Sequence, residues 1–273
     1  MKFKYFLLML VMCLSLTGCK PLRDAQNSSK FNTAQSEMNK ALFNSDVIAA
    51  RKAADKMIAI SPEWVTFASI ATSATLFGHV NARHGKKKIA EDISKFSIDY
   101  LNEALKRFPK LPSKEKASLY SLLGESYVIS DQTAQMVDNY EKAIKLAPAN
   151  TVYLNNYAFR LTEQRSNLSY AVELARKAFK LTGDDPTVED TLGWALAFSG
   201  KYKEAIEHLE NALLMTSDAK GEIAYHLGYA YLMSARWQEA VVTLEKAINL
   251  PLDTKERAEA KRLLKLARQK KTN

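Results

Sequence analysis

Hydrophobic and small residues return along the second half of the chain at a nearly constant spacing. Leu123-Gly124, Leu192-Gly193 and Leu227-Gly228 open three segments, and Tyr157-Ala158 opens a fourth between the first two. The intervals between positions 124, 158, 193 and 228 are 34, 35 and 35 residues. This period predicts stacked helical hairpins, because a single hairpin of that length buries its apolar face only against a neighbour.

Small residues recur in the second half of each segment, where a second helix is expected to cross the first. In the last two segments they alternate with leucine at equivalent places: Ala205, Leu209 and Ala212, then Ala240, Leu244 and Ala247. Small side chains let two helices approach closely, so these positions predict tight helix crossings. Gly200-Lys201 and Ala235-Arg236 are expected to form the turns between the paired helices.

These residues resemble the tetratricopeptide repeat (TPR) family, whose pattern has Leu-Gly and an aromatic residue in the first helix and alanines in the second. The resemblance covers residues 117–254 as four repeats, although the first Trp of the family pattern is absent throughout. Residues 34–116 read as two degenerate TPR-like hairpins with an insertion near 78–90. The fold class that the resemblance implies is all-α, a right-handed superhelical solenoid of TPR hairpins.

Residues 255–273 are predicted to form a basic capping helix on this solenoid. An apolar stripe at helical spacing runs through it: Ala260, Leu263, Leu264 and Ala267. Asp253 or Thr254 can serve as the N-cap. Such a helix closes the open end of a repeat array with a polar outer face.

The formal charge of +9 is concentrated at the two ends of the chain. Lys2 and Lys4 contribute +2, and the eight basic and three acidic residues of 253–273 contribute +5, which leaves about +2 for the body. A protein that reads nucleic acid carries a basic stripe across its body. We therefore expect no nucleic-acid partner.

The N-terminus predicts export. Lys2 and Lys4 precede a run of 12 predominantly apolar residues, Tyr5 to Leu16, which is shorter than the roughly 20 residues that span a bilayer. A positive start and a short apolar core predict a signal peptide at 1–18. Leu16-Thr17-Gly18-Cys19 resembles the lipobox of bacterial lipoproteins. The alternative is an ordinary signal peptide with a chance cysteine.

The lipoprotein resemblance implies cleavage before Cys19 and acyl chains on that residue. Residues 19–33 would then be the lipidated cysteine and a flexible tether. Lys20 follows the cysteine, which resembles lipoproteins forwarded to the outer membrane. The expected location is a lipid-anchored envelope protein, on the periplasmic face of the outer membrane if the source is Gram-negative.

Motifs for catalysis and metal binding are absent from the sequence. The two cysteines are Cys13, which leaves with the signal peptide, and Cys19, so no thiol is expected in the folded body. The four histidines form no H-E-x-x-H pair or Cys/His cluster, and no phosphate-binding loop or nucleophile elbow occurs. We expect no metal, no cofactor and no enzyme activity.

In the TPR family the first helix of each hairpin lines a concave groove that binds partners. Transferred onto this chain, that register places ten residues in the groove: Asn155, Asn156, Phe159, Asp190, Trp194, Phe198, Tyr225, His226, Tyr229 and Met233. Aromatic side chains supply large contact areas and often anchor binding. The alternative is that several of them complete the packing between repeats, and for Trp194 the two interpretations weigh equally.

The expected function is that of a membrane-anchored TPR scaffold or adaptor for protein or peptide partners in the bacterial cell envelope. Assembly of a secretion or pilus system is one role that the resemblance suggests. Two alternatives stay open: a self-associating structural lipoprotein that forms a homo-oligomer, and a regulatory subunit of a cell-wall remodelling enzyme. The repeats alone do not choose between them.

Overall fold

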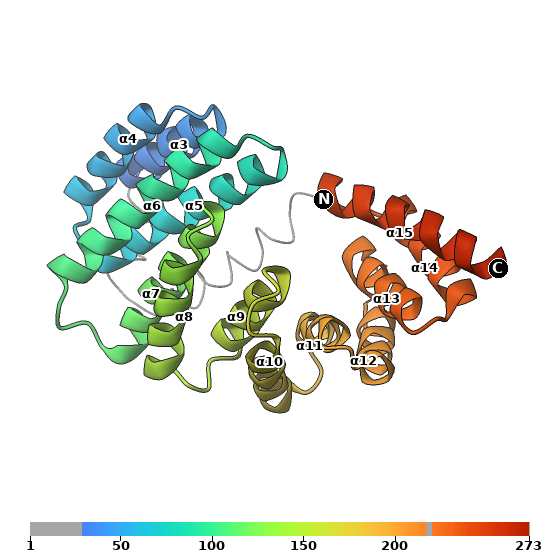
Figure 1. Ribbon diagram of the computed structural model, residues 1–273. Helices are drawn as coiled ribbons and strands as arrows, with labels where there is room; N and C mark the ends of the chain where they lie inside the picture. Colours follow the sequence, from blue (N-terminus) through green and yellow to red (C-terminus); the bar gives the residue numbers. More distant parts are fainter. Residues whose placement is uncertain (1–28, 217–219, 273) are drawn as a thin grey trace. The chain divides into compact units, whose positions relative to one another are not determined.

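The protein is helical throughout the part that the computed structural model describes, residues 29–216 and 220–272 (Figure 1). These residues form thirteen helices and no strand. The helices are α3 (Ser29–Phe43), α4 (Val47–Ile60), α5 (Trp64–Arg83), α6 (Lys87–Arg107), α7 (Ser113–Ile129), α8 (Thr133–Leu146), α9 (Thr151–Glu163), α10 (Leu168–Thr182), α11 (Pro186–Phe198), α12 (Tyr202–Leu214), α13 (Gly221–Met233), α14 (Trp237–Asn249) and α15 (Thr254–Thr272). The predicted all-α fold class is confirmed.

The described helices begin earlier than the sequence suggested. The predicted signal peptide at 1–18, Cys19 and residues 20–28 of the predicted tether lie outside the described residues. Residues 29–33, which were also assigned to the tether, belong to α3. The reason is Phe31, whose side chain is fully buried and continues the apolar face of Ala34 and Met38.

The chain divides into two compact units, 1–147 and 148–273. In the first, the hairpins are α3–α4, α5–α6 and α7–α8, and the first helices α3, α5 and α7 pack on one another in order. In the second, the hairpins α9–α10, α11–α12 and α13–α14 are followed by α15, and α9, α11, α13 and α15 pack in order. Each unit is thus a short array of hairpins whose first helices form a continuous layer.

Close crossings within the hairpins depend on glycine. A Cβ added to Gly193 would lie 2.5 Å from Cγ of Leu209, and one added to Gly228 would lie 2.7 Å from Cδ2 of Leu244. At Gly124 the ring of Tyr140 occupies the same space, 2.8 Å from the added atom. The spacing that organises the sequence therefore marks the points where first and second helices touch.

The second hairpin differs from the others by its length. α5 and α6 have 20 and 21 residues, and the predicted insertion near 78–90 forms the last turn and a half of α5, the connecting turn and the start of α6. Gly78 admits the side chain of Ile129, which would lie 2.9 Å from an added Cβ. The extra residues therefore lengthen both helices of the hairpin.

Each turn between paired helices contains at least one residue with positive φ: Gly85 has it between α5 and α6, and both Arg165 and Asn167 have it between α9 and α10. In four hairpins this residue carries a side chain: Ser45, Asp131, Arg165 and Ala235, with φ between 50° and 64°. Gly200 occupies the same place between α11 and α12, with φ of 77°. A left-handed residue closes the helix before it and redirects the chain into the next one.

The last helix, α15, covers the end of the second unit. Asp253 accepts a hydrogen bond from the backbone N–H of Glu256 at 2.8 Å, as expected of an N-cap. The stripe Ala260, Leu263 and Ala267 is fully buried. Within residues 29–216 and 220–272 every helix is too short or too polar to cross a bilayer.

Candidate functional site: an aromatic surface in the second unit

Aromatic residues of α11 and α13 gather around Trp194. The Trp194 ring centroid lies 4.4 Å from that of Phe198, 5.2 Å from that of Tyr229 and 5.7 Å from that of Tyr225. Trp194 and Tyr229 occupy equivalent places in successive hairpins, 35 residues apart. The repeat itself thus brings these rings together, because equivalent positions of stacked helices face one another.

Trp194 forms the buried floor of this cluster. Its side chain is 2% exposed, and its indole Nε1–H donates to Oε1 of Glu163 at 2.9 Å. A buried indole requires such an acceptor, so Glu163 at the end of α9 fixes the orientation of the ring. Of the two interpretations offered by the sequence, the structure places Trp194 in the packing between hairpins.

His226 lies on the other side of the indole and forms a buried ion pair. The imidazole stacks on Trp194 with ring centroids 4.0 Å apart, and its Nδ1 lies 2.8 Å from Oδ1 of Asp190. Burial opposes the charged form of His226, but the Asp190 carboxylate outweighs it, with help from Glu222 and Glu256, and raises the pKa of His226 to about 9. The charged pair is therefore part of the core that supports the surface.

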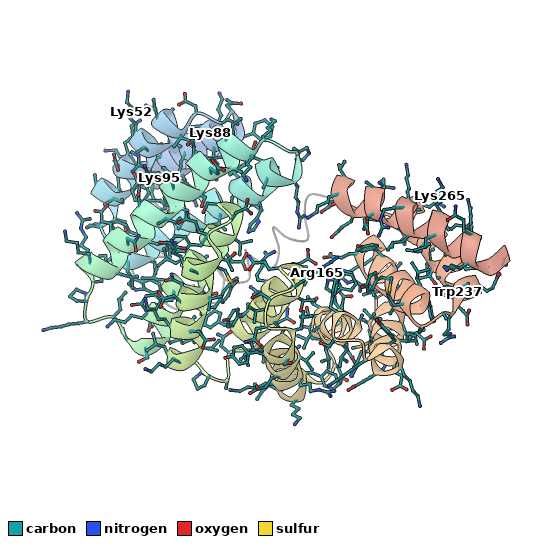
Figure 2. The ribbon with its side chains drawn as sticks, viewed as in Figure 1. Lys52, Lys88, Lys95, Arg165, Trp237 and Lys265 are labelled. Carbon is teal, nitrogen blue, oxygen red and sulfur yellow. The ribbon has the colours of Figure 1, made fainter. Side chains whose placement is uncertain are left out.

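The exposed part of the cluster is a pair of stacked rings with a cation beside it. Phe198 and Tyr229 are half-buried and stack with ring centroids 5.2 Å apart and planes inclined by 17°. The guanidinium of Arg165, in the turn after α9, lies 5.1 Å from the centre of the Phe198 ring and is exposed (Figure 2). A flat, partly apolar surface with a neighbouring cation is suited to contact with another molecule.

Carboxylates also lie close to this surface. Burial raises the pKa of Tyr225, and the charges of Glu259, Glu163 and Glu256 raise it further. Glu259 and Glu256 belong to α15, so the capping helix contributes to the same face. The Glu259 carboxylate also forms a two-pronged ion pair with Arg262, at 2.8 and 2.6 Å.

The ten residues predicted to line the groove divide into three groups. Five are buried and contribute little surface to a partner: Asn155, Asp190, Trp194, Tyr225 and His226. Four are half-buried: Asn156, Phe159, Phe198 and Tyr229. Met233, at 36%, is exposed. Burial by neighbouring hairpins is the reason that the first group serves the core.

Arg165, Glu163 and Glu259 are the members of this face that the sequence did not reveal. Arg165 lies after the repeat positions of α9 that define the groove, and Glu259 lies in the capping helix, whereas Glu163 occupies the repeat position equivalent to Phe198, 35 residues earlier. The repeat register was the available signal for Glu163, whereas the sequence shows no recurring charge that would have identified Arg165 or Glu259.

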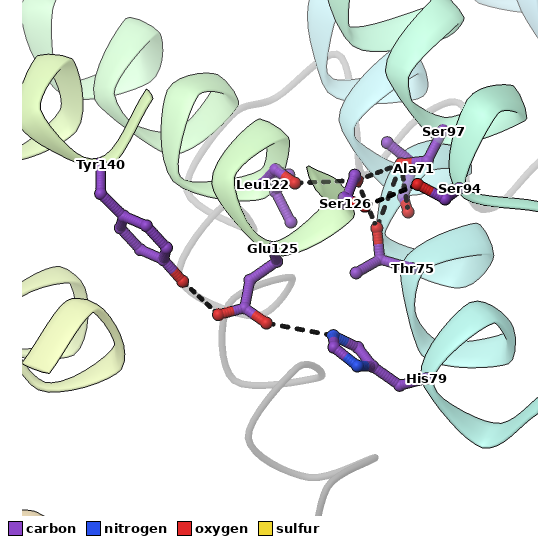
Figure 3. Close-up of polar contacts among 9 residues, drawn as sticks. All are labelled: Ala71, Thr75, His79, Ser94, Ser97, Leu122, Glu125, Ser126 and Tyr140. Atoms are coloured by element: carbon purple, nitrogen blue, oxygen red, sulfur yellow. Dashed lines mark hydrogen bonds and ion pairs between the residues drawn. The ribbon is translucent and has the colours of Figure 1, made fainter. Parts of the chain in front are cut away.

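A second polar cluster occupies the interior of the first unit (Figure 3). Glu125 accepts a hydrogen bond from the hydroxyl of Tyr140 and lies 3.1 Å from Nε2 of His79. Nearby, Thr75 and Ser126 contact each other at 3.0 Å between their hydroxyl oxygens. The cluster joins α5, α7 and α8 through charged and polar groups.

The hydroxyl groups of this cluster are sealed from solvent. The side chains of Thr75, Ser94, Ser97 and Ser126 are fully buried. The Ser94 hydroxyl donates to the backbone carbonyl oxygen of Ser126 at 2.5 Å, and the Ser126 hydroxyl donates to that of Leu122 at 2.9 Å. Because these hydroxyl groups satisfy one another, they serve packing between the helices.

No group of three or more metal-binding side chains occurs in residues 29–216 and 220–272. The prediction of no metal concerns the whole chain and stays a prediction. The aromatic surface offers contact area, ring stacking and charge to a binding partner.

Comparisons with known proteins agree with this architecture. The tetratricopeptide repeat model matches residues 117–150 and 191–218. A TPR repeat-containing protein of Pseudomonas aeruginosa is 33% identical over 129 residues, 46% of this chain. The chain spans about a fifth of that relative's length, since the match covers 20% of it.

Solved structures with the same fold have low sequence identity. The Cut9–Hcn1 complex of APC/C contains a chain that is 17% identical, with a TM-score of 0.57 over 86% of this chain and 49% of that one. The Pseudomonas aeruginosa protein pilF is 18% identical, with a TM-score of 0.51 over 73% of this chain and 86% of its own. Repeat spacing, hairpin packing and these matches lead to one conclusion: the chain contains tetratricopeptide repeats, matched at residues 117–150 and 191–218, and has the all-α fold of TPR proteins.

Proposed function

We propose that this chain is a lipid-anchored TPR adaptor that binds protein partners in a bacterial cell envelope through the aromatic surface of its second unit. The TPR fold is a scaffold for protein–protein interaction. The observation that carries the proposal is the half-exposed stack of Phe198 on Tyr229, beside the guanidinium of Arg165. These groups form the accessible layer above a buried floor.

Rigidity makes this surface suitable for binding. The two rings rest on Trp194, which the hydrogen bond to Glu163 and the stacking on His226 hold in place. A preorganised aromatic pair loses little conformational entropy when a partner covers it. Arg165 and the carboxylates of α15 provide charges of both signs at the edge, which favours a mixed apolar and polar segment of a protein.

The membrane anchor is proposed from the sequence. The lipobox-like Leu16-Thr17-Gly18-Cys19 supports acylation of Cys19, and attachment through two or more acyl chains anchors a protein stably. Lys20 after the cysteine supports the periplasmic face of the outer membrane in a Gram-negative source. At that location, an adaptor for the assembly of a secretion or pilus system is the role we favour.

The proposed activity is non-enzymatic. TPR proteins are generally non-catalytic scaffolds, and the hydroxyl groups of the polar cluster in the first unit are buried. We therefore expect the second unit to bind a partner through its aromatic contact area.

The test is crosslinking in native membranes followed by capture of the tagged full-length chain. The Phe198→Ala/Tyr229→Ala variant is compared with wild type and with Val242→Ala, a 56% exposed position on α14. Envelope proteins captured by wild type and by the Val242 variant, but lost with the double variant, support an adaptor. Identical captures from all three proteins, or crosslinks between copies of this chain alone, would overturn it.

A further inference from the structure

Two large apolar side chains project from the turn between α3 and α4. Phe43, the last residue of α3, is 70% exposed, and Ile48, in the first turn of α4, is 74% exposed. Single exposed apolar residues are normal on protein surfaces. Here, however, two of them flank a connection of only three residues, 44–46, so they extend from one tip of the first unit.

Backbone hydrogen bonds hold this tip in a defined conformation. The N–H of Ser45 donates to the carbonyl of Leu42 at 3.0 Å, and that of Asp46 donates to Ala41 at 2.8 Å. The Asp46 carboxylate accepts the N–H of Ala49 at 2.9 Å and caps α4. Phe43 and Ile48 are thus exposed on a closed turn between two helices.

Three exposed lysines lie on the helices that carry or adjoin the apolar pair. Lys40 precedes Phe43 by three residues and Lys52 follows Ile48 by four, so each lies one helical turn from its apolar neighbour. Lys95 of α6 and Ile48 line the same open pocket of about 620 Å³. Figure 2 shows Lys52 and Lys95 on the same side of the first unit.

Basic residues near these three lysines form ion pairs, whereas the three lysines form none within the described part of the chain. Arg51 binds Asp99 at 2.8 Å, and Lys88 binds Asp92 at 3.0 Å. Within residues 29–216 and 220–272, Lys40, Lys52 and Lys95 form no ion pair. Their charge is therefore left available to an anionic partner.

We propose that this membrane tip, formed by Phe43, Ile48, Lys40, Lys52 and Lys95, docks onto the surface of an anionic lipid bilayer. Apolar side chains that enter the headgroup region and lysines that meet anionic headgroups are the two components of interfacial binding. The pattern fits a bilayer because the apolar pair is small and exposed, and exposed lysines that form no ion pair among the described residues lie on the helices beside it. A protein partner or a second copy is the alternative occupant.

The position of the tip in the chain agrees with the anchor, and the inference rests on that part of the proposed function. Nine residues, 20–28, lie between Cys19 and Ser29, and covalent geometry lets the ten Cα-to-Cα steps span at most about 35 Å. α3 has 15 residues and extends about 20 Å from Ser29 to Phe43. An acyl chain at Cys19 would therefore keep the tip within reach of the same bilayer, where even a weak contact is populated.

The test places an environment-sensitive fluorophore, NBD, on Asn44→Cys in the full acylated chain. Asn44 is exposed within the tip, and the native cysteines are confined to positions 13 and 19. The labelled protein is reconstituted into phosphatidylcholine vesicles with or without phosphatidylglycerol, each containing nitroxide-labelled lipid. Val242→Cys in the second unit is the control label, and flotation of the vesicles reports anchoring independently.

The expected result is a blue shift and quenching of the label at position 44 in the anionic vesicles. High salt or Lys40→Gln/Lys52→Gln/Lys95→Gln reduces this quenching, and Phe43→Ser/Ile48→Ser abolishes it, while flotation is unchanged and the label at position 242 stays unquenched. Circular dichroism confirms that both variants keep their helices.

Other outcomes separate the two proposals. Protein that floats while the label at position 44 is as unquenched as that at position 242 overturns the membrane tip and leaves the anchor intact. Quenching that survives Phe43→Ser/Ile48→Ser also overturns the tip. Flotation only with anionic vesicles, lost in Phe43→Ser/Ile48→Ser, supports the tip and contradicts the anchor. Protein that floats with neither composition contradicts both.

Discussion

The indole of Trp194 stacks on the imidazole of His226, with ring centroids 4.0 Å apart and planes inclined by 17°, although the two residues belong to successive hairpins. This contact separates the aromatic cluster into a buried and an accessible layer. Trp194, His226 and Asp190 join α11 to α13 from within, whereas Phe198 and Tyr229 form the layer above them. The residues expected to stabilise the unit and those proposed to bind a partner are therefore different members of one cluster.

Trp194→Ala is expected to destabilise the second unit far more than changes in the accessible layer. Removal of a buried indole costs about 3–5 kcal/mol, while Phe198→Ala or Tyr229→Ala costs about 1–2 kcal/mol because each ring is half exposed. Urea unfolding followed by circular dichroism measures the difference. If the three substitutions cost the same, the division into a floor and a surface is wrong.

Stability is expected to fall as pH rises from about 6.5 to 9, because the pKa of His226 is raised in the folded state to about 9. The stabilisation by the charged His226–Asp190 pair is complete below the unfolded pKa, about 6.5, and is lost as pH passes the folded value. The expected loss is about 2–3 kcal/mol.

Urea unfolding between pH 6 and 10 measures this dependence, and His226→Gln is the control. The variant should be less stable at pH 6 and should lack the decline above that pH. A wild-type protein whose free energy of unfolding rises or stays level across this range would show that the Asp190 carboxylate does not hold the proton on His226.

Two glycines of α11 and its following turn are expected to resist substitution for different reasons. Gly193→Ala places a Cβ 2.5 Å from Leu209 and overpacks the hairpin, at a cost of about 1–3 kcal/mol. Gly200→Ala meets no neighbour but must hold φ near 77°, at a cost of about 1 kcal/mol.

Shortening Leu209 distinguishes overpacking at Gly193 from backbone strain at Gly200. Leu209→Ala should partly relieve Gly193→Ala in a double-mutant cycle, and it should leave the effect of Gly200→Ala unchanged. Additive effects of Gly193→Ala and Leu209→Ala on the free energy of unfolding would argue against a close crossing at this point.

Acylation of Cys19 is expected in the mature protein. The N-terminal peptide of the protein purified from membranes should begin at Cys19 and carry acyl chains, which mass spectrometry detects. Cys19→Ser should abolish incorporation of labelled palmitate. A mature chain that begins elsewhere, or an unmodified Cys19, would contradict the lipoprotein prediction.

The fold could be predicted from the sequence because glycine and alanine mark the helix crossings in every hairpin of the second unit. Gly193 and Gly228 touch the leucines that the same spacing selects, and Asp253 caps α15 as expected. The start of α3 was missed because Phe31 lies in a polar segment, so its burial becomes evident only when α3 packs on its neighbours.

The candidate site was less accessible to sequence reasoning. The repeat register identifies the side of a helix on which Tyr225 and His226 lie, but it does not reveal how much of that side α15 and the neighbouring hairpin cover. Phe198 and Tyr229 extend farther and stay half exposed. Arg165 and Glu259 joined the surface through tertiary structure, since neither occupies a groove position of the repeat.

The central claim is that the layer formed by Phe198 and Tyr229 contacts another protein. The most direct measurement is photo-crosslinking in living cells with benzoylphenylalanine at position 198, compared with the same residue at position 242 on α14. We predict a light-dependent adduct with a distinct envelope protein from position 198 and none from position 242. The same adducts from both positions, or none from position 198, would contradict the claim.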